Sequence, residues 1–90
     1  MPARNLVILS PPDRPESPAE RIRRLQTEAR TLAKEHVQML ARALSDVSRL
    51  ADEIADGGEA YPVGARELSR RLTEDCGMQA MTLSAILDRL

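Results

Sequence analysis

Large aromatic side chains are almost absent from this sequence. Of its 90 residues none is Trp or Phe, and Tyr61 is the only Tyr. Aromatic rings usually supply much of the buried area of a small domain, so a core here has to be built from Leu, Ile, Val, Met and Ala. Chains of this size often need a disulfide, a metal or a partner subunit to stabilise such a core.

Cysteine and histidine are equally scarce, with Cys76 and His36 as the only examples. A single Cys forms no disulfide within the chain, and a structural zinc site needs about four Cys or His ligands. We therefore expect no metal and no cofactor. Oligomerisation remains as the route to a stable fold, and we expect a homodimer.

A surplus of charge is missing as well. The chain has 13 Lys and Arg against 14 Asp and Glu, a net charge of −1, whereas binding to nucleic acid or to an anionic membrane by counterion release requires a cationic surplus. No apolar run approaches the ~20 residues that cross a bilayer. The short run at 5–9 leads into Pro11 and Pro12 instead of a signal cleavage site. We expect a cytoplasmic protein without nucleic-acid or membrane partners.

Prolines mark the N-terminal part, residues 1–17, as a flexible tail. Four prolines between positions 10 and 18 exclude regular structure, because each fixes its own backbone and restricts the residue before it. Ahead of them lies a β-prone apolar patch at 5–9. It is either a disordered end or a peptide that docks on this chain or on a partner, through Leu6, Val7, Ile8 and Leu9.

A long amphipathic helix is predicted over residues 18–56. Ser17, Pro18 and Glu20 match a capping box with proline at the first helical position, and Gly57 and Gly58 can end the helix. Apolar residues recur every three or four positions and keep one face, opposite the charged residues. This stripe consists of Leu25, Ala29, Leu32, His36, Leu40, Ala43, Val47, Ala51 and Ile54.

A second helix is predicted over 62–90, after a turn at 57–61. Its apolar face keeps phase past Gly77, which we expect on the outer side of the helix. The face consists of Leu68, Leu72, Cys76, Gln79, Leu83, Ile86 and Leu90. Residues 18–90 thus predict an all-α fold, a long two-helix antiparallel hairpin.

Two helices in contact along single stripes leave much of each apolar face in water, and a dimer that forms a four-helix bundle would cover it. The first helix is also predicted to be the longer, so its start at Ile22 and Leu25 needs a cover, either a second subunit or residues 5–9. We expect the dimer core to contain Leu32, His36, Leu40, Val47, Leu72 and Leu83.

His36 raises the question of phosphotransfer, because phosphotransfer domains are helical bundles of similar size. Their histidine is exposed and followed by Lys and Gly, whereas Val37, Gln38 and Met39 follow here. The motif is absent, and we interpret His36 as a hydrogen-bonded residue of the core or interface. A pH-sensing role at the interface is the alternative.

No catalytic arrangement emerges from the remaining polar residues. Cys76 lies at a core position without an orienting base, and Glu74 and Asp75 point about 100° apart on a helix. We expect no enzyme. Met78 and Met81 lie off the apolar face and predict a second surface for a protein partner, because methionine adapts to irregular contacts.

Charge along the first helix runs against its dipole, with Arg21, Arg23 and Arg24 near the start and Asp52 and Glu53 near the end. A second copy of the helix, packed antiparallel, would offset this unfavourable charge order by placing its acidic end beside the basic start. We predict a small non-enzymatic adaptor or regulatory protein that acts by self-association and protein binding. The alternatives are a DNA-linked transcriptional regulator that uses paired arginine clusters from 21–30, and a structural subunit of a larger assembly.

Overall fold

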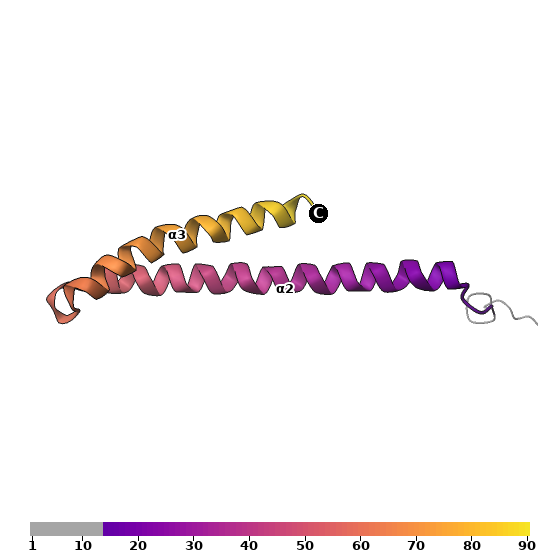
Figure 1. Ribbon diagram of the computed structural model, residues 1–90, viewed down its shortest axis with the longest axis horizontal. Coiled ribbons are helices and arrows are strands. Elements are labelled where there is room, and N and C mark those ends of the chain that lie inside the picture. The colour runs from indigo at the N-terminus through magenta and orange to yellow at the C-terminus, as the bar shows by residue number, and fades with distance from the viewer. Residues whose placement is uncertain (1–13) are drawn as a thin grey trace, which may run out of the picture. The chain divides into compact units, whose positions relative to one another are not determined.

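The computed structural model describes residues 14–90, and in that range it contains two α-helices and no β-strand. Helix α2 spans Pro18–Ala55, helix α3 spans Val63–Asp88, and a short 3-10 helix, η3, covers Gly58–Ala60 between them (Figure 1). The predicted all-α class and helical hairpin are confirmed. The predicted apolar patch at 5–9 lies outside the described residues.

The chain divides into two units. The first ends at Thr31 and holds the start of α2. The second, Leu32–Leu90, holds the rest of α2 together with η3 and α3.

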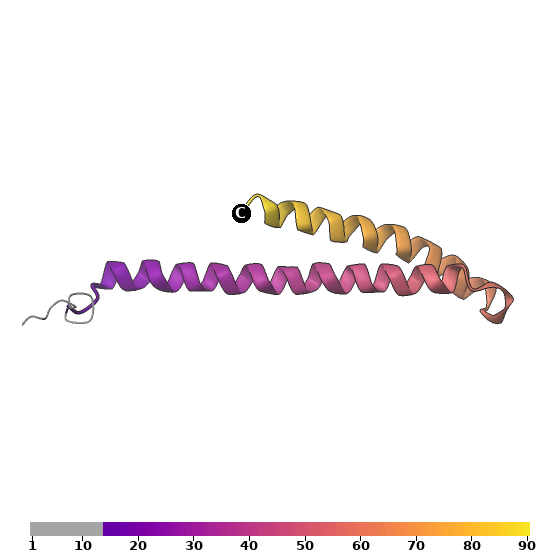
Figure 2. The same cartoon turned by 180° about the vertical axis from the view of Figure 1, so that it is seen from behind.

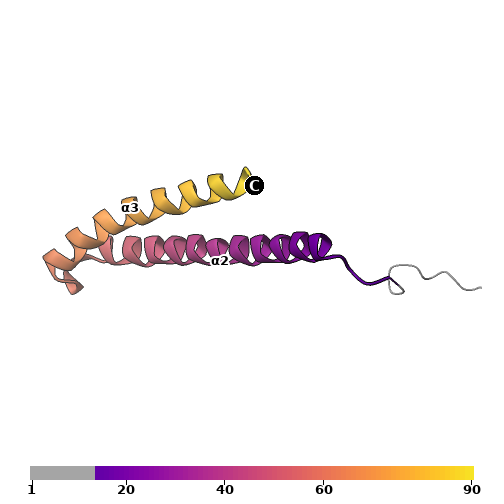
Figure 3. The same ribbon diagram turned by 45° about the vertical axis from the view of Figure 1, so that its right-hand side comes forward.

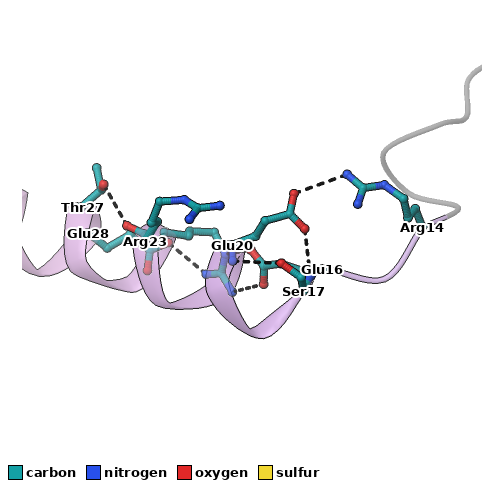
Figure 4. A network of polar contacts seen from close by, with 8 residues as sticks. Arg14, Glu16, Ser17, Glu20, Arg23, Thr27 and Glu28 are labelled. Atoms are coloured by element: carbon teal, nitrogen blue, oxygen red, sulfur yellow. Dashed lines mark hydrogen bonds and ion pairs between the residues drawn. The ribbon is translucent and has the colours of Figure 1, made fainter.

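A capping box begins α2, as the sequence predicted. The Ser17 amide donates to the Glu20 carboxylate at 2.9 Å, and the Glu20 amide donates to the Ser17 hydroxyl oxygen at 3.1 Å (Figure 4). Arg14 also donates to Glu20, at 3.4 Å. The two reciprocal bonds satisfy backbone donors that the helix start would leave open, and Pro18 supplies a backbone already set for the first turn.

Arg24 joins the residues before α2 to its second turn. Its Nε and Nη2 donate to Glu16 at 2.8 and 3.0 Å, and its Nη1 donates to Glu28 at 3.3 Å. The hydrogen bond from Arg24 lowers the pKa of Glu16, and the same bond raises the pKa of Arg24. Because these groups lie at the surface, each pair adds little to stability.

Small side chains form the seam between the two helices of the hairpin. In Figures 1, 2 and 3, α3 runs back alongside α2 in the opposite direction. The buried residues of the two helices are Ala41, Ala51 and Ala55 from α2 and Ser69, Ala80 and Leu87 from α3. With so little side-chain volume between them, the two backbones can approach closely.

Polar contacts hold the middle of this seam. The Ser48 hydroxyl donates to the Thr73 carbonyl oxygen at 2.8 Å, and the Thr73 hydroxyl donates to the Ser69 carbonyl oxygen at 2.9 Å and reaches the Ser48 carbonyl oxygen at 3.4 Å. A Cβ at Gly77 would lie 3.2 Å from the Ser48 hydroxyl oxygen. The expected outward position of Gly77 was therefore wrong: Gly77 faces Ser48, and a Cβ there would be closer to the hydroxyl oxygen than an ordinary van der Waals contact.

Two glycines and Tyr61 shape the turn. Gly58 has a φ of 77°, in the left-handed region that favours glycine. A side chain at Gly57 would overlap the ring of Tyr61, so the ring closes directly over the backbone there. Pro62 then precedes α3, and its carbonyl oxygen accepts the Arg66 amide at 3.0 Å.

Replacing Gly77 with Leu should force the seam apart, because its side chain would meet Ser48. We expect a loss of about 2 kcal/mol in the free energy of unfolding, the usual cost of overpacking, measured by chemical denaturation. Gly64→Leu is the matched control, since a Cβ at Gly64 meets nothing within 4 Å. Equal stability of the two variants would contradict the close seam.

The capping box should make the start of α2 sensitive to acid. The Ser17 amide, with smaller contributions from the Ser17 hydroxyl and Arg14, lowers the pKa of Glu20 below its ordinary 4.5. A lowered pKa in the folded state means that the carboxylate stabilises the fold above pH 4.5 and loses this effect as the pH falls below that value. We expect the Tm of Glu20→Gln to fall less between pH 7 and pH 3 than that of the wild-type chain, and parallel losses would contradict the assignment.

Candidate functional site

The hairpin buries its alanines and exposes its larger apolar side chains. Leu32 is 65% exposed, Leu40 53% and Leu68 55%, whereas Ala41 and Ala80 are 7% and 4% exposed. Among the described residues, Leu87 is the only buried apolar residue larger than Ala. Small domains normally bury Leu, Ile and Val first, whereas the described part of this chain exposes most of them.

The exposed apolar side chains of α2 lie directly beside the seam. Ala41, Ser48 and Ala55 recur every seven residues and lie along the seam, and the residue before each of them lies about 100° around the helix. Those preceding residues are Leu40, Val47 and Ile54. The apolar stripe predicted from sequence therefore contacts α3 along one edge only, and its remainder faces outward.

Helix α3 contributes to the same surface. An open groove of about 430 Å³ is lined from α2 by Leu40 and Leu44 and from α3 by residues that include Gln79 and Leu83. Leu72 and Ile86 lie on the same side of α3 and are 37% and 46% exposed. We define the apolar face as Leu32, Leu40, Val47, Leu68, Leu72, Leu83 and Ile86.

The residues expected in a dimer core take different positions around this face. Leu40 and Leu83 come together in the groove between the helices. Leu32, Val47 and Leu72 are exposed, and none of the expected residues lies buried in the seam. His36 is exposed too and adjoins Met39 and Leu40 in a shallow depression on α2.

The residues expected to bind a partner also take different positions. Met78 lines the groove beside Leu40, while Met81 is 74% exposed and lies on the far side of α3 from the apolar face. Leu6, Val7, Ile8 and Leu9 lie outside the described residues. The two methionines are neighbours one turn apart on α3, and of the two only Met78 lines the groove.

The opposite side of the seam is polar. A second open groove of about 460 Å³ is lined there mainly by Gln38, Arg42, Ser45, Asp46, Ser84 and Asp88. Residues 14–90 contain no group of three His, Cys, Asp or Glu side chains placed to hold a metal ion, and the single Cys76 is half-buried. Neither described helix is long and apolar enough to cross a membrane. The hairpin thus has one apolar side and one charged side.

The small-residue seam is the feature that sequence reasoning missed. Its signal was present as the seven-residue spacing of Ala41, Ser48 and Ala55, which matches Ser69 to Cys76 and Ala80 to Leu87 on the second helix. The leucines obscure this spacing, because large apolar residues at helical intervals usually mark the contact between two helices.

Comparison with models of protein families, with curated proteins and with solved structures finds no match to this chain.

Ala41 lies in the seam and Leu40 lies beside it, so a charged side chain should have a different effect at each of these two positions. Ala41→Asp places a carboxylate in the buried seam, and we expect it to cost about 3 kcal/mol in the free energy of unfolding at any protein concentration. Leu40→Asp leaves the seam intact, so at low concentration it should cost less than half as much. Denaturant titrations of both variants at about 1 µM would measure this difference. An equal cost would show that Leu40 belongs to the core of the single chain.

Proposed function

We propose that this chain is a small cytoplasmic, non-enzymatic helical protein that acts as an adaptor or regulator by self-association and by binding another protein. The observation that supports it best is the exposure of the apolar face beside a seam made of alanine and serine. Burial of apolar area is the main driving force for association. Contiguous apolar patches of this kind mark interaction sites on small proteins.

A second copy is the occupant we assign to this face, in a two-fold four-helix bundle. Both helices of the hairpin offer apolar residues to the same side, which is the arrangement that two hairpins need to close a common core. Met81, on the other side of α3, then stays available to a different protein, together with the apolar patch at 5–9.

The arginines of early α2 give less support to a DNA-linked regulator. Of the cluster at 21–30, only Arg24 is paired within the described residues, with Glu16 and Glu28, and phosphate binding there would have to displace these carboxylates. The net charge of −1 also gives the chain no cationic surplus.

Self-association predicts that thermal stability depends on concentration. A tenfold rise in protein adds about 1.4 kcal/mol to a folded dimer, or about 5 °C in Tm for a domain of this size. Leu40→Asp should abolish the dependence, and circular dichroism melts over a dilution series would measure it. Met81→Asp is the matched control and should keep it, because Met81 lies off the apolar face.

A Tm that stays constant over a hundredfold dilution, with full helix content, would contradict the proposal. In that case a segment of the same chain would have to cover the apolar face. The patch at 5–9 is the one apolar stretch of sequence outside the described residues that could do so.

A further inference from the structure

Charged side chains along one side of α2 are only partly paired with each other within the single chain. Starting from the apolar stripe and moving away from the seam with α3, most of the next side chains around the helix are charged, and Met39, Arg21 and Asp46 share this arc. We define the charged edge by six of them: Arg24, Glu28, Glu35, Arg42, Arg49 and Glu53. All six are exposed, and Arg42 also lines the polar groove that the helices form on the other side of the seam.

Ion pairs within the described residues leave part of this edge unmatched. Arg24 pairs with Glu28 at 3.3 Å and Arg49 with Glu53 at 3.4 Å, both one turn apart on the same helix. Between residues 14 and 90, Glu35 and Arg42 form no ion pair. They lie two turns apart, about 10 Å along the helix, so they do not meet each other in one chain.

We propose that two copies of the chain pack with their α2 helices antiparallel and with the two-fold axis at the peptide bond between Gln38 and Met39. This inference rests on the proposed self-association and specifies its geometry. About this axis Glu35 of one copy faces Arg42 of the other, because both are equally distant from it along the helix. Glu28 faces Arg49 and Arg24 faces Glu53 by the same relation.

The apolar residues match about the same axis. Leu32 of one copy lies level with the stretch between Leu44 and Val47 of the second copy, and Ile22 lies level with the stretch around Ile54. The pairing also places the exposed start of α2 against the end of the other α2. Thus the basic first turns of each helix meet the acidic last turns, which offsets the unfavourable charge order of the helix dipole.

Other alignments do not preserve these pairs of opposite charges. A shift of one turn sets Arg24 against Arg49 in one direction and Glu28 against Glu53 in the other. A parallel pair would place the two charged edges on opposite sides of the contact, where they would not face each other. Exposed ion pairs contribute little to affinity, so the apolar stripe drives the association and the charged edge selects the alignment.

Cysteine cross-linking in a Cys76→Ser chain tests the axis directly. Met39→Cys lies next to the axis, so its two copies should join by a disulfide under mild oxidation. Leu50→Cys is the matched control, because Leu50 is exposed on the same side of α2 as Met39. Its two copies would lie about 35 Å apart along the helix, far beyond the ~7 Å between Cα atoms that a disulfide spans. Non-reducing gels and solution mass are the readouts.

A dimer that cross-links through position 39 and not through position 50 supports the proposal. Cross-links at both positions would indicate a parallel pair and overturn it. A dimer that cross-links only at 50 or at neither position would overturn the axis and leave self-association standing. A monomeric mass at all concentrations would overturn both.

Charge exchange tests the register independently. Glu35→Arg and Arg42→Glu should each raise the dimer Kd about tenfold at low salt, since either change makes two contacts repulsive. The double variant should return to within about twofold of wild type. Exchange of Glu67 and Arg70, an exposed pair on α3, is the control and should have no effect. A double variant as weak as the two single ones would contradict the pairing of Glu35 with Arg42.

Discussion

The contact of Ser48 with Thr73 and Gly77 is the constraint on which the hairpin depends. A hydroxyl at this point bonds to a backbone carbonyl of the other helix at 2.8 Å, which requires the two backbones to lie close together. Ala41, Ala51 and Ala80 allow the same approach along the rest of the seam. Close packing of small residues gains contact between backbones, but each alanine buries only one methyl group, worth about 0.8 kcal/mol.

The close approach of the two helices excludes most of the leucines from the seam. Because small residues line the seam, the larger apolar side chains of both helices lie to one side of it, at Leu40 and Leu83 in the groove and at Leu68 and Ile86 beyond it. A chain with no Trp or Phe and one Tyr has little else to bury. The seam therefore fixes how the helices pair, and the exposed leucines are the surface on which the proposed self-association rests.

Much of the fold could be predicted from local signals. The capping box at Ser17 and Glu20, the glycines of the turn and the helical spacing of apolar residues are each short-range features. The seam could not be predicted so readily, because the apolar stripe of α2 is wider than one helix contact and does not show which edge meets α3. Gly77 illustrates the problem: its position follows from Ser48 on the other helix, not from its neighbours in sequence.

The solution mass of the chain tests the account most directly, measured by light scattering on a size-exclusion peak at micromolar concentration. The chain has a mass of 10.0 kDa. We expect a helical species of twice that mass, with the apolar face covered by a second copy. A helical species at the mass of one chain, unchanged over a hundredfold range of concentration, would contradict the account.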